Sequence, residues 1–309
     1  MKRFRVRHRN RYIYDDQVGL NYGEARLLPR DAPGQRVLSS WLELDPQPDD
    51  YREHNDMYGN RLAWFNLRQP HRRLEITAHA EIERTSVSLP AASPAWERVA
   101  ERLVAPLSGD DALIREFCLA SPFVPLDAAA AEYARPSFTA DRPIIEAVAD
   151  LARRVHADFI YNPSATEIGT PIAEVLRERH GVCQDFAHLC LSGLRGLGLA
   201  ARYVSGWLET EPPPGAPPQI GADASHAWIA VHVPEHGWVD FDPTNGSLTG
   251  AGHLTLAWGR DFTDVTPLKG VIYGGGNHAL EVGVTVQRLT IDPGTEIIKP
   301  SFVDKSQED

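Results

Sequence analysis

One cysteine stands where a helix is expected to begin, and this position favours an ionised thiol. Gly181 ends one helical segment, and Cys183 falls in the first turn of the next helix, which should end near Gly196. Unpaired backbone N–H groups and the helix dipole both favour a thiolate there, and the thiolate is the nucleophilic form of cysteine. A lone cysteine is more often a buried structural residue, so the prediction of a nucleophile depends on partner residues.

A nucleophilic cysteine needs a base and a group that orients the base, and the sequence offers both on one hairpin. Two alternating strands meet at a short turn over residues 234–237, which places His226 beside Asp242. The carboxylate could then align the imidazole and stabilise its protonated form. Asp240 shares a strand face with Asp242, so spacing does not separate the two. The position before Pro243 favours Asp242.

Helices and an antiparallel sheet are expected to position these three side chains. Apolar residues recur at helical spacing from Ile144 to Val155, and Thr170–Pro171 begins a second helix that should stop at Gly181. Strands are expected after the cysteine-bearing helix, at residues 200–208, 226–233, 237–242, 253–258 and 280–289. The sequence therefore predicts a helix with a cysteine packed on a sheet with a histidine and an aspartate.

The first ninety residues have a different character and are expected to form strands. Period-two alternation or β-rich composition marks residues 4–14, 23–28, 36–44, 61–67 and 74–82, with turn signals between them. This pattern predicts a small antiparallel β-sandwich. Arginines alternate along residues 3–9, and a phosphate-binding face is one interpretation of this stripe. A solvated or charge-guarded strand face is the favoured interpretation.

Composition excludes several classes of protein. The 309 residues are 42% hydrophobic and 24% charged, as in soluble globular proteins, and carry a formal net charge of −11. An acidic chain without a basic domain is a poor nucleic-acid binder. No run approaches the roughly 20 apolar residues that span a bilayer. Three cysteines and a basic N-terminus without a following apolar segment predict a cytoplasmic protein without a secretory signal.

Three motifs in a fixed order carry a family resemblance. They are Gly-Val-Cys-Gln-Asp-Phe-Ala-His-Leu at 181–189, Ser-His-Ala-Trp at 225–228 and Trp-Val-Asp-Phe-Asp-Pro-Thr at 238–244. Together they resemble the transglutaminase-like superfamily of papain-like Cys-His-Asp enzymes, and its bacterial branch with a β-rich N-terminal region. The resemblance covers roughly residues 1–85 and 150–250, and residues 259–265 also resemble that branch. It implies Cys183 as nucleophile, His226 as base and acid, and Asp242 as orienting residue.

The chain departs from the animal tissue transglutaminases of that superfamily. Those enzymes have a tryptophan upstream of the cysteine that stabilises the oxyanion, whereas residues 159–163 here contain none. Their calcium-binding acidic loops are not evident either, so neither transglutamination nor calcium dependence is carried over. We expect the oxyanion at the backbone N–H of Cys183, helped by a side-chain donor such as Tyr161 or Gln184. Asp185, Trp228 and Asp240 are expected to support the site.

These observations lead to one expected architecture. The fold should be α+β, with an N-terminal antiparallel β-sandwich-like domain over residues 1–90 and a papain-like, transglutaminase-like core over residues 91–299. Residues 300–309 should form a loose tail. The proline-rich loop at 212–218 and the glycines at 274–276 are expected at the rims of the cleft.

The expected function is acyl transfer from peptide or carboxamide bonds through a thioester. A cysteine protease or amidase is favoured, because water is always present as an acceptor. Protein-glutamine transglutaminase and a non-catalytic peptide-binding scaffold are the alternatives. The expected partner is a peptide or protein substrate, with no nucleic acid or membrane, and a homo-oligomer is left open. No close Cys-x-x-Cys pair exists, and no metal or other cofactor is expected.

Overall fold

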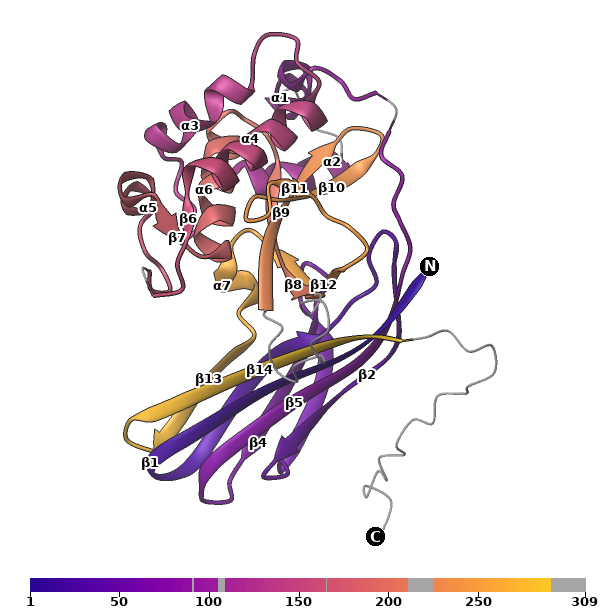
Figure 1. The fold of residues 1–309 in the computed structure, drawn as a ribbon. Coiled ribbons are helices and arrows are strands. Elements are labelled where there is room, and N and C mark those ends of the chain that lie inside the picture. The colour runs from indigo at the N-terminus through magenta and orange to yellow at the C-terminus, as the bar shows by residue number, and fades with distance from the viewer. Residues whose placement is uncertain (91, 105–108, 165, 211–224, 290–309) are drawn as a thin grey trace, which may run out of the picture.

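The computed structural model describes residues 1–90, 92–104, 109–164, 166–210 and 225–289. In these ranges the chain forms two lobes (Figure 1). A long twisted sheet, here called the β lobe, lies below a mixed helical and β part, here called the core lobe. The α+β class that the sequence predicts is confirmed. No helix in the described ranges is long and apolar enough to cross a membrane.

The β lobe is organised around one strand of 27 residues. Its strands are β1 (Lys2–Leu28), β2 (Gln35–Asp45), β3 (Asp50–Asn55), β4 (Arg61–Leu67) and β5 (His71–Arg84), in the order β2-β5-β1-β4-β3. Buried residues alternate along much of β1, as a strand with one covered face requires. Two differences from the sequence prediction stand out. The segments predicted at 4–14 and 23–28 are one strand, and β3 was not predicted.

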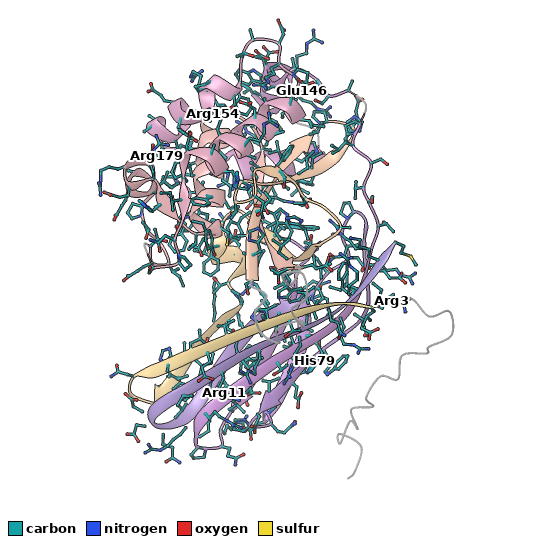
Figure 2. The ribbon with its side chains drawn as sticks, in the orientation of Figure 1. Arg3, Arg11, His79, Glu146, Arg154 and Arg179 are labelled. Atoms are coloured by element: carbon teal, nitrogen blue, oxygen red, sulfur yellow. The ribbon has the colours of Figure 1, made fainter. Side chains whose placement is uncertain are left out.

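The arginine stripe of β1 is covered by acidic side chains of β5. Arg3 contacts Glu83, Arg5 contacts Glu81 and Arg11 contacts Glu75, each at 2.7 Å. Figure 2 labels Arg3 and Arg11 on this sheet. These cross-strand ion pairs account for two of the alternating arginines in residues 3–9, Arg3 and Arg5.

The end of the described chain returns to the β lobe. Strands β13 (Leu268–Gly274) and β14 (His278–Leu289) both pair antiparallel with β1, on separate stretches of it. Residues 268–289, which the sequence assigned to the core, thus lie in the N-terminal sheet. The alternation in residues 280–289 predicts a strand, but it carries no information on which distant strand will be its partner.

Helices cover one side of the core lobe. Their bounds are α1 (Trp96–Val104), α2 (Gly109–Arg115), η1 (Glu116–Cys118), α3 (Ala128–Ala134), η2 (Arg135–Ser137), α4 (Ile144–Asp158), α5 (Ile172–Glu178), α6 (Cys183–Gly196) and α7 (Phe262–Val265). Helix α6 is buried along most of its length. A Cβ on its Gly193 would lie 2.9 Å from the backbone oxygen of Ala130, so glycine lets α3 approach closely.

The second sheet lies against α6. Its strands are β8 (Ala201–Leu208), β9 (Ser225–Val233), β10 (Gly237–Asp242), β11 (Ser247–Leu248) and β12 (His253–Gly259), in the order β11-β10-β9-β8-β12. All of its pairings are antiparallel. A short parallel pair, β6 (Ile160–Tyr161) and β7 (His180–Gly181), leads into α6. Helix α5 ends earlier than predicted, at Glu178, and the φ of 56° at Arg179 then turns the chain into β7.

Candidate active site

Cys183 is the first residue of α6, which the spacing of Gly181 and Gly196 predicts. Val182 before it is extended, and its N–H donates to the carboxylate of Asp185 at 2.8 Å. The Thr166 hydroxyl donates to the same carboxylate oxygen at 2.7 Å. Asp185 is therefore a helix cap that fixes the turn in which the sulfur lies. Cys183 is half-buried and packs against the hydrophobic core.

His226 and Asp242 lie together as the hairpin predicts. The Nε2 atom of His226 is 2.8 Å from Oδ2 of Asp242, and the carboxylate is fully buried. Cys183 is near the same ring, because its sulfur contributes to the raised pKa of His226. Because Asp242 occupies Nε2, Nδ1 is the ring nitrogen that is left for the sulfur. The structure thus brings Cys183, His226 and Asp242 into one connected group, and their catalytic roles stay a prediction.

The surroundings of His226 favour its protonated form. Burial alone would lower the pKa of the imidazole, but hydrogen bonds to Asp242 and Cys183, together with their charges, raise it to about 10. Burial would likewise raise the pKa of Asp242. Hydrogen bonds from His226, His253 and Asn245 outweigh it and hold that pKa well below its usual range. At neutral pH the group therefore contains an imidazolium beside an ionised carboxylate.

Two residues that the sequence prediction missed, His253 and Asn245, also donate hydrogen bonds to Asp242. Oδ2 accepts from His253 Nε2 at 3.0 Å and from Asn245 Nδ2 at 2.6 Å. Oδ1 accepts from the backbone N–H groups of Thr244 and Asn245 at 2.9 and 3.1 Å. An aspartate that precedes a turn commonly accepts such backbone bonds, so Asn245 had a local signal. His253 had none, because only the fold brings β12 to this carboxylate.

The histidine pair does not fit a metal site. Nε2 of His226, Nε2 of His253 and a carboxylate oxygen of Asp242 lie within 4.8 Å of one another, a spacing that ligands of a metal ion could have. However, the N–H of Gly250 donates to Nδ1 of His253 at 3.1 Å, so the ring proton is on Nε2. A metal at that Nε2 would need the proton on Nδ1, facing another N–H. Hydrogen bonding to Asp242 explains the cluster better.

The two aspartates of β10, which spacing alone left ambiguous, have different neighbours. Asp240 lies beside Arg202, whose guanidinium is stacked between Trp238 and Trp258 at 4.4 and 3.8 Å. Burial raises the pKa of Asp240, although the charge of Arg202 opposes the change. Asp240 thus interacts electrostatically with buried arginines, and it is Asp242 that contacts His226.

The remaining predicted residues lie around this group. Trp228 is fully buried, with its ring 6.0 Å from that of His226 and 5.3 Å from that of His253. Tyr161, on β6, is 51% exposed, and both partial burial and the charge of Cys183 raise its pKa. Its phenol is therefore near the sulfur and remains a hydrogen-bond donor at neutral pH. Gln184 follows Cys183 in the first turn of α6 and is half-buried.

Only one of the two segments expected at the rims of the cleft lies within the described residues. The proline-rich loop at 212–218 lies outside the described residues. The glycine turn at 274–276 joins β13 to β14 and bonds to Asp16 and Gln17 of β1. Its contacts are thus within the β lobe, and the expectation that it lines the cleft is corrected. The reason is the return of β13 and β14 to the N-terminal sheet.

Comparisons with known proteins agree with this architecture. The family model of the bacterial transglutaminase-like N-terminal region matches residues 4–83, and that of the transglutaminase-like superfamily matches residues 131–243. An uncharacterised protein of Mycobacterium tuberculosis is 41% identical over 295 residues, which are 92% of each chain. One of Mycobacterium leprae is 32% identical over 292 residues, covering 94% of this chain and 100% of that one.

Two further relatives are more distant. A solved structure described as a candidate cysteine protease, from Cytophaga hutchinsonii, superposes with a TM-score of 0.71 at 19% identity and covers 99% of this chain and 95% of its own. It confirms the predicted papain-like fold. A protein-glutamine gamma-glutamyltransferase of Pseudomonas aeruginosa is 33% identical over 97 residues, 30% of this chain and 14% of that protein.

Proposed function

We propose that this chain, which belongs to the transglutaminase-like superfamily, is a thiol-dependent acyl-transfer enzyme. Its proposed substrates are peptide or carboxamide bonds, and hydrolysis is the favoured outcome, as in a cysteine protease or amidase. One observation carries the proposal: Nε2 of His226 lies 2.8 Å from Oδ2 of Asp242, and Cys183 is close enough to the same ring to raise its pKa. Superfamily membership alone would support an enzyme without assigning its residues.

The first half of the proposed reaction consumes the proton of His226. The Cys183 thiolate attacks the carbonyl carbon, and the carbonyl electron pair moves to oxygen. The backbone N–H of Cys183 and the Tyr161 hydroxyl are the proposed donors to that oxyanion. When the carbonyl re-forms, the carbon–nitrogen bond breaks, and His226 gives its proton to the departing amine. A thioester on Cys183 and a neutral imidazole remain.

The second half restores the starting state. Neutral His226 takes a proton from water, and the resulting hydroxide attacks the thioester carbon. The carbon–sulfur bond then breaks, which releases a carboxylic acid and returns the thiolate and the imidazolium. Asp242 keeps its charge throughout and holds the ring in one orientation.

A primary amine could replace water in the second half, which would make the enzyme a transglutaminase. The P. aeruginosa relative named as a gamma-glutamyltransferase supports this alternative, over a limited part of the chain. Hydrolysis is favoured because water is always available, whereas amine transfer needs a site that excludes it. A non-catalytic scaffold is disfavoured, since a scaffold has no need for a buried, ion-paired histidine next to a helix-start thiol.

Mass spectrometry separates these possibilities. Wild-type protein and Cys183→Ala are incubated with a peptide library, with and without an added primary amine. Cleaved or deamidated peptides indicate hydrolysis, and loss of ammonia with gain of the amine indicates transfer. Cys118→Ala is the matched control, because it removes a half-buried thiol whose sulfur instead contacts the backbone of Gly198. If wild type and Cys183→Ala give the same products, or if no peptide is converted, the proposal fails.

A further inference from the structure

Strand β12 is an edge strand whose outer side is covered by two amide side chains of the β lobe. The Gln35 amide donates to the backbone oxygen of Thr255 at 2.7 Å and accepts from its N–H at 2.8 Å. Asn60 makes the same pair of bonds with Trp258, at 2.7 and 2.9 Å. Each amide thus supplies the two hydrogen bonds that a neighbouring strand would supply.

Both amides are held rigidly. Gln35 is 5% exposed and Asn60 is fully buried. The backbone oxygen of Arg30 accepts a second bond from Gln35 at 2.8 Å, and the Arg30 guanidinium donates to Asn60 at 2.9 Å. The same guanidinium lies 3.4 Å above the ring of Trp258. The β lobe therefore fixes the position of β12 at two points.

The residue that begins β12 is His253, which donates to Asp242 at 3.0 Å. Thr255, clamped by Gln35, is two residues further along the same strand. A continuous series of hydrogen bonds and one short stretch of strand therefore connect the β lobe with Asp242. From Asp242 the series continues to His226, whose ring interacts electrostatically with Cys183.

We propose that the β lobe belongs to the catalytic apparatus, with Gln35, Asn60 and His253 as positioning residues that act through Asp242. The amides hold β12 where His253 can donate to the carboxylate. With His253 on one side and Asn245 on the other, Oδ2 cannot rotate away from His226. A displaced β12 would free the carboxylate, and the imidazolium that pairs with the thiolate would lose its fixed partner. The consequence for turnover rests on the proposed function.

The test uses the chemistry of Cys183 itself, so it needs no substrate. Full-length protein is treated with iodoacetamide, and alkylation of Cys183 is followed by mass spectrometry at about pH 6 and about pH 10. A free thiol, with its pKa near 8.5, should react roughly 300-fold more slowly at the lower pH. For a thiolate paired with an imidazolium, the alkylation rates at the two pH values should differ by less than about tenfold. The ratio of the two rates shows whether the thiolate is paired with an imidazolium. Altered access to the sulfur would instead change both rates equally.

Four variants are compared with the wild type. His253→Phe removes the donor to Asp242 and should increase the rate ratio by about tenfold, since one hydrogen bond is lost at the partner of the imidazolium. His253→Gln retains an N–H donor and should stay within about twofold of the wild type. Gln35→Leu leaves the site untouched and should increase the ratio by about threefold. Tyr58→Phe is the matched control, because it removes an inter-lobe bond to Glu116 that does not involve β12.

The outcomes separate this inference from the proposed function. If the wild type itself shows the rate ratio of a free thiol, the positioning role and the proposed function are both wrong. If the wild-type ratio is small and both His253→Phe and Gln35→Leu preserve it, the positioning role is wrong and the proposed function stands. Equal slowing at both pH values would also refute the positioning role, as would an effect of Tyr58→Phe as large as that of Gln35→Leu. Tyr161, Tyr203 and His226, the titratable groups that interact with Cys183, are unchanged in every variant.

Discussion

Asp240 and Asp242 lie two residues apart on one strand face, and they have opposite electrostatic surroundings. Asp242 accepts five hydrogen bonds, from two histidines, an asparagine side chain and two backbone N–H groups. Asp240 interacts with the guanidinium groups of Arg202 and Arg84, but burial raises its pKa. The number of donors, and not the depth of burial, therefore decides which carboxylate has the lowered pKa and can orient an imidazole. The surroundings of Asp242 are suited to catalysis, and those of Asp240 are suited to packing.

The largest expected effect is a loss of activity that separates the two regions. Asp242→Ala should lower turnover of a substrate from the peptide library by about 10³–10⁴-fold, because the imidazole loses its orienting charge. Asp240→Ala, the matched change two residues away, should cost less than about tenfold. Steady-state kinetics at a temperature where both variants are folded would check this. Similar losses in the two variants would contradict the assignment of Asp242.

The second prediction concerns stability in the Asp240 region. Arg202→Met should lower the free energy of unfolding by about 1–3 kcal/mol, because Asp240 would lose one of the two guanidinium charges that stabilise its ionised form. Two tryptophan rings would also lose the stacked guanidinium. Urea denaturation followed by tryptophan fluorescence measures the change. An unfolding free energy equal to that of the wild type would mean that Asp240 is satisfied without Arg202.

The third prediction concerns the titration of His226. Since its pKa is raised to about 10, the ring carries a proton at neutral pH and loses it as the pH rises through about 10. Activity should then fall on the alkaline side, because a neutral imidazole cannot protonate the departing amine. NMR titration of ¹⁵N-labelled His226 should show this midpoint. In Asp242→Asn we expect the midpoint to drop by at least about one pH unit, equivalent to about 1.4 kcal/mol. A midpoint near 6.5 in the wild type would refute the ion pair.

The smallest expected effect lies on the surface of the β lobe. Arg5 pairs with Glu81 at 2.7 Å, but its side chain is 59% exposed. Arg5→Ala should therefore change the free energy of unfolding by less than about 1 kcal/mol, in contrast to Arg202. The same urea titration at low and high salt gives the value. A loss as large as that expected for Arg202→Met would show that this stripe has a role beyond cross-strand pairing.

The sequence predicts the parts of the site that depend on local signals. Gly181 and the first turn after it place Cys183 at a helix start, and the turn at 234–237 brings His226 to Asp242. His253 could not be predicted as a partner of Asp242, because β12 reaches that carboxylate only through the strand order of the sheet. The same holds for β13 and β14. Their partner, β1, is more than 200 residues away in the sequence, and alternation specifies a face but no partner.

The return of β13 and β14 to β1 has a practical consequence for anyone who wishes to express the core lobe separately. Because the β lobe is made from both ends of the described chain, a fragment of residues 92–265 would require two truncations. Such a fragment would leave the N–H and C=O groups of Thr255 and Trp258 open on a bare edge. Bare edges recruit strands from other chains, so the fragment should aggregate unless a substitute for Gln35 and Asn60 is designed into it.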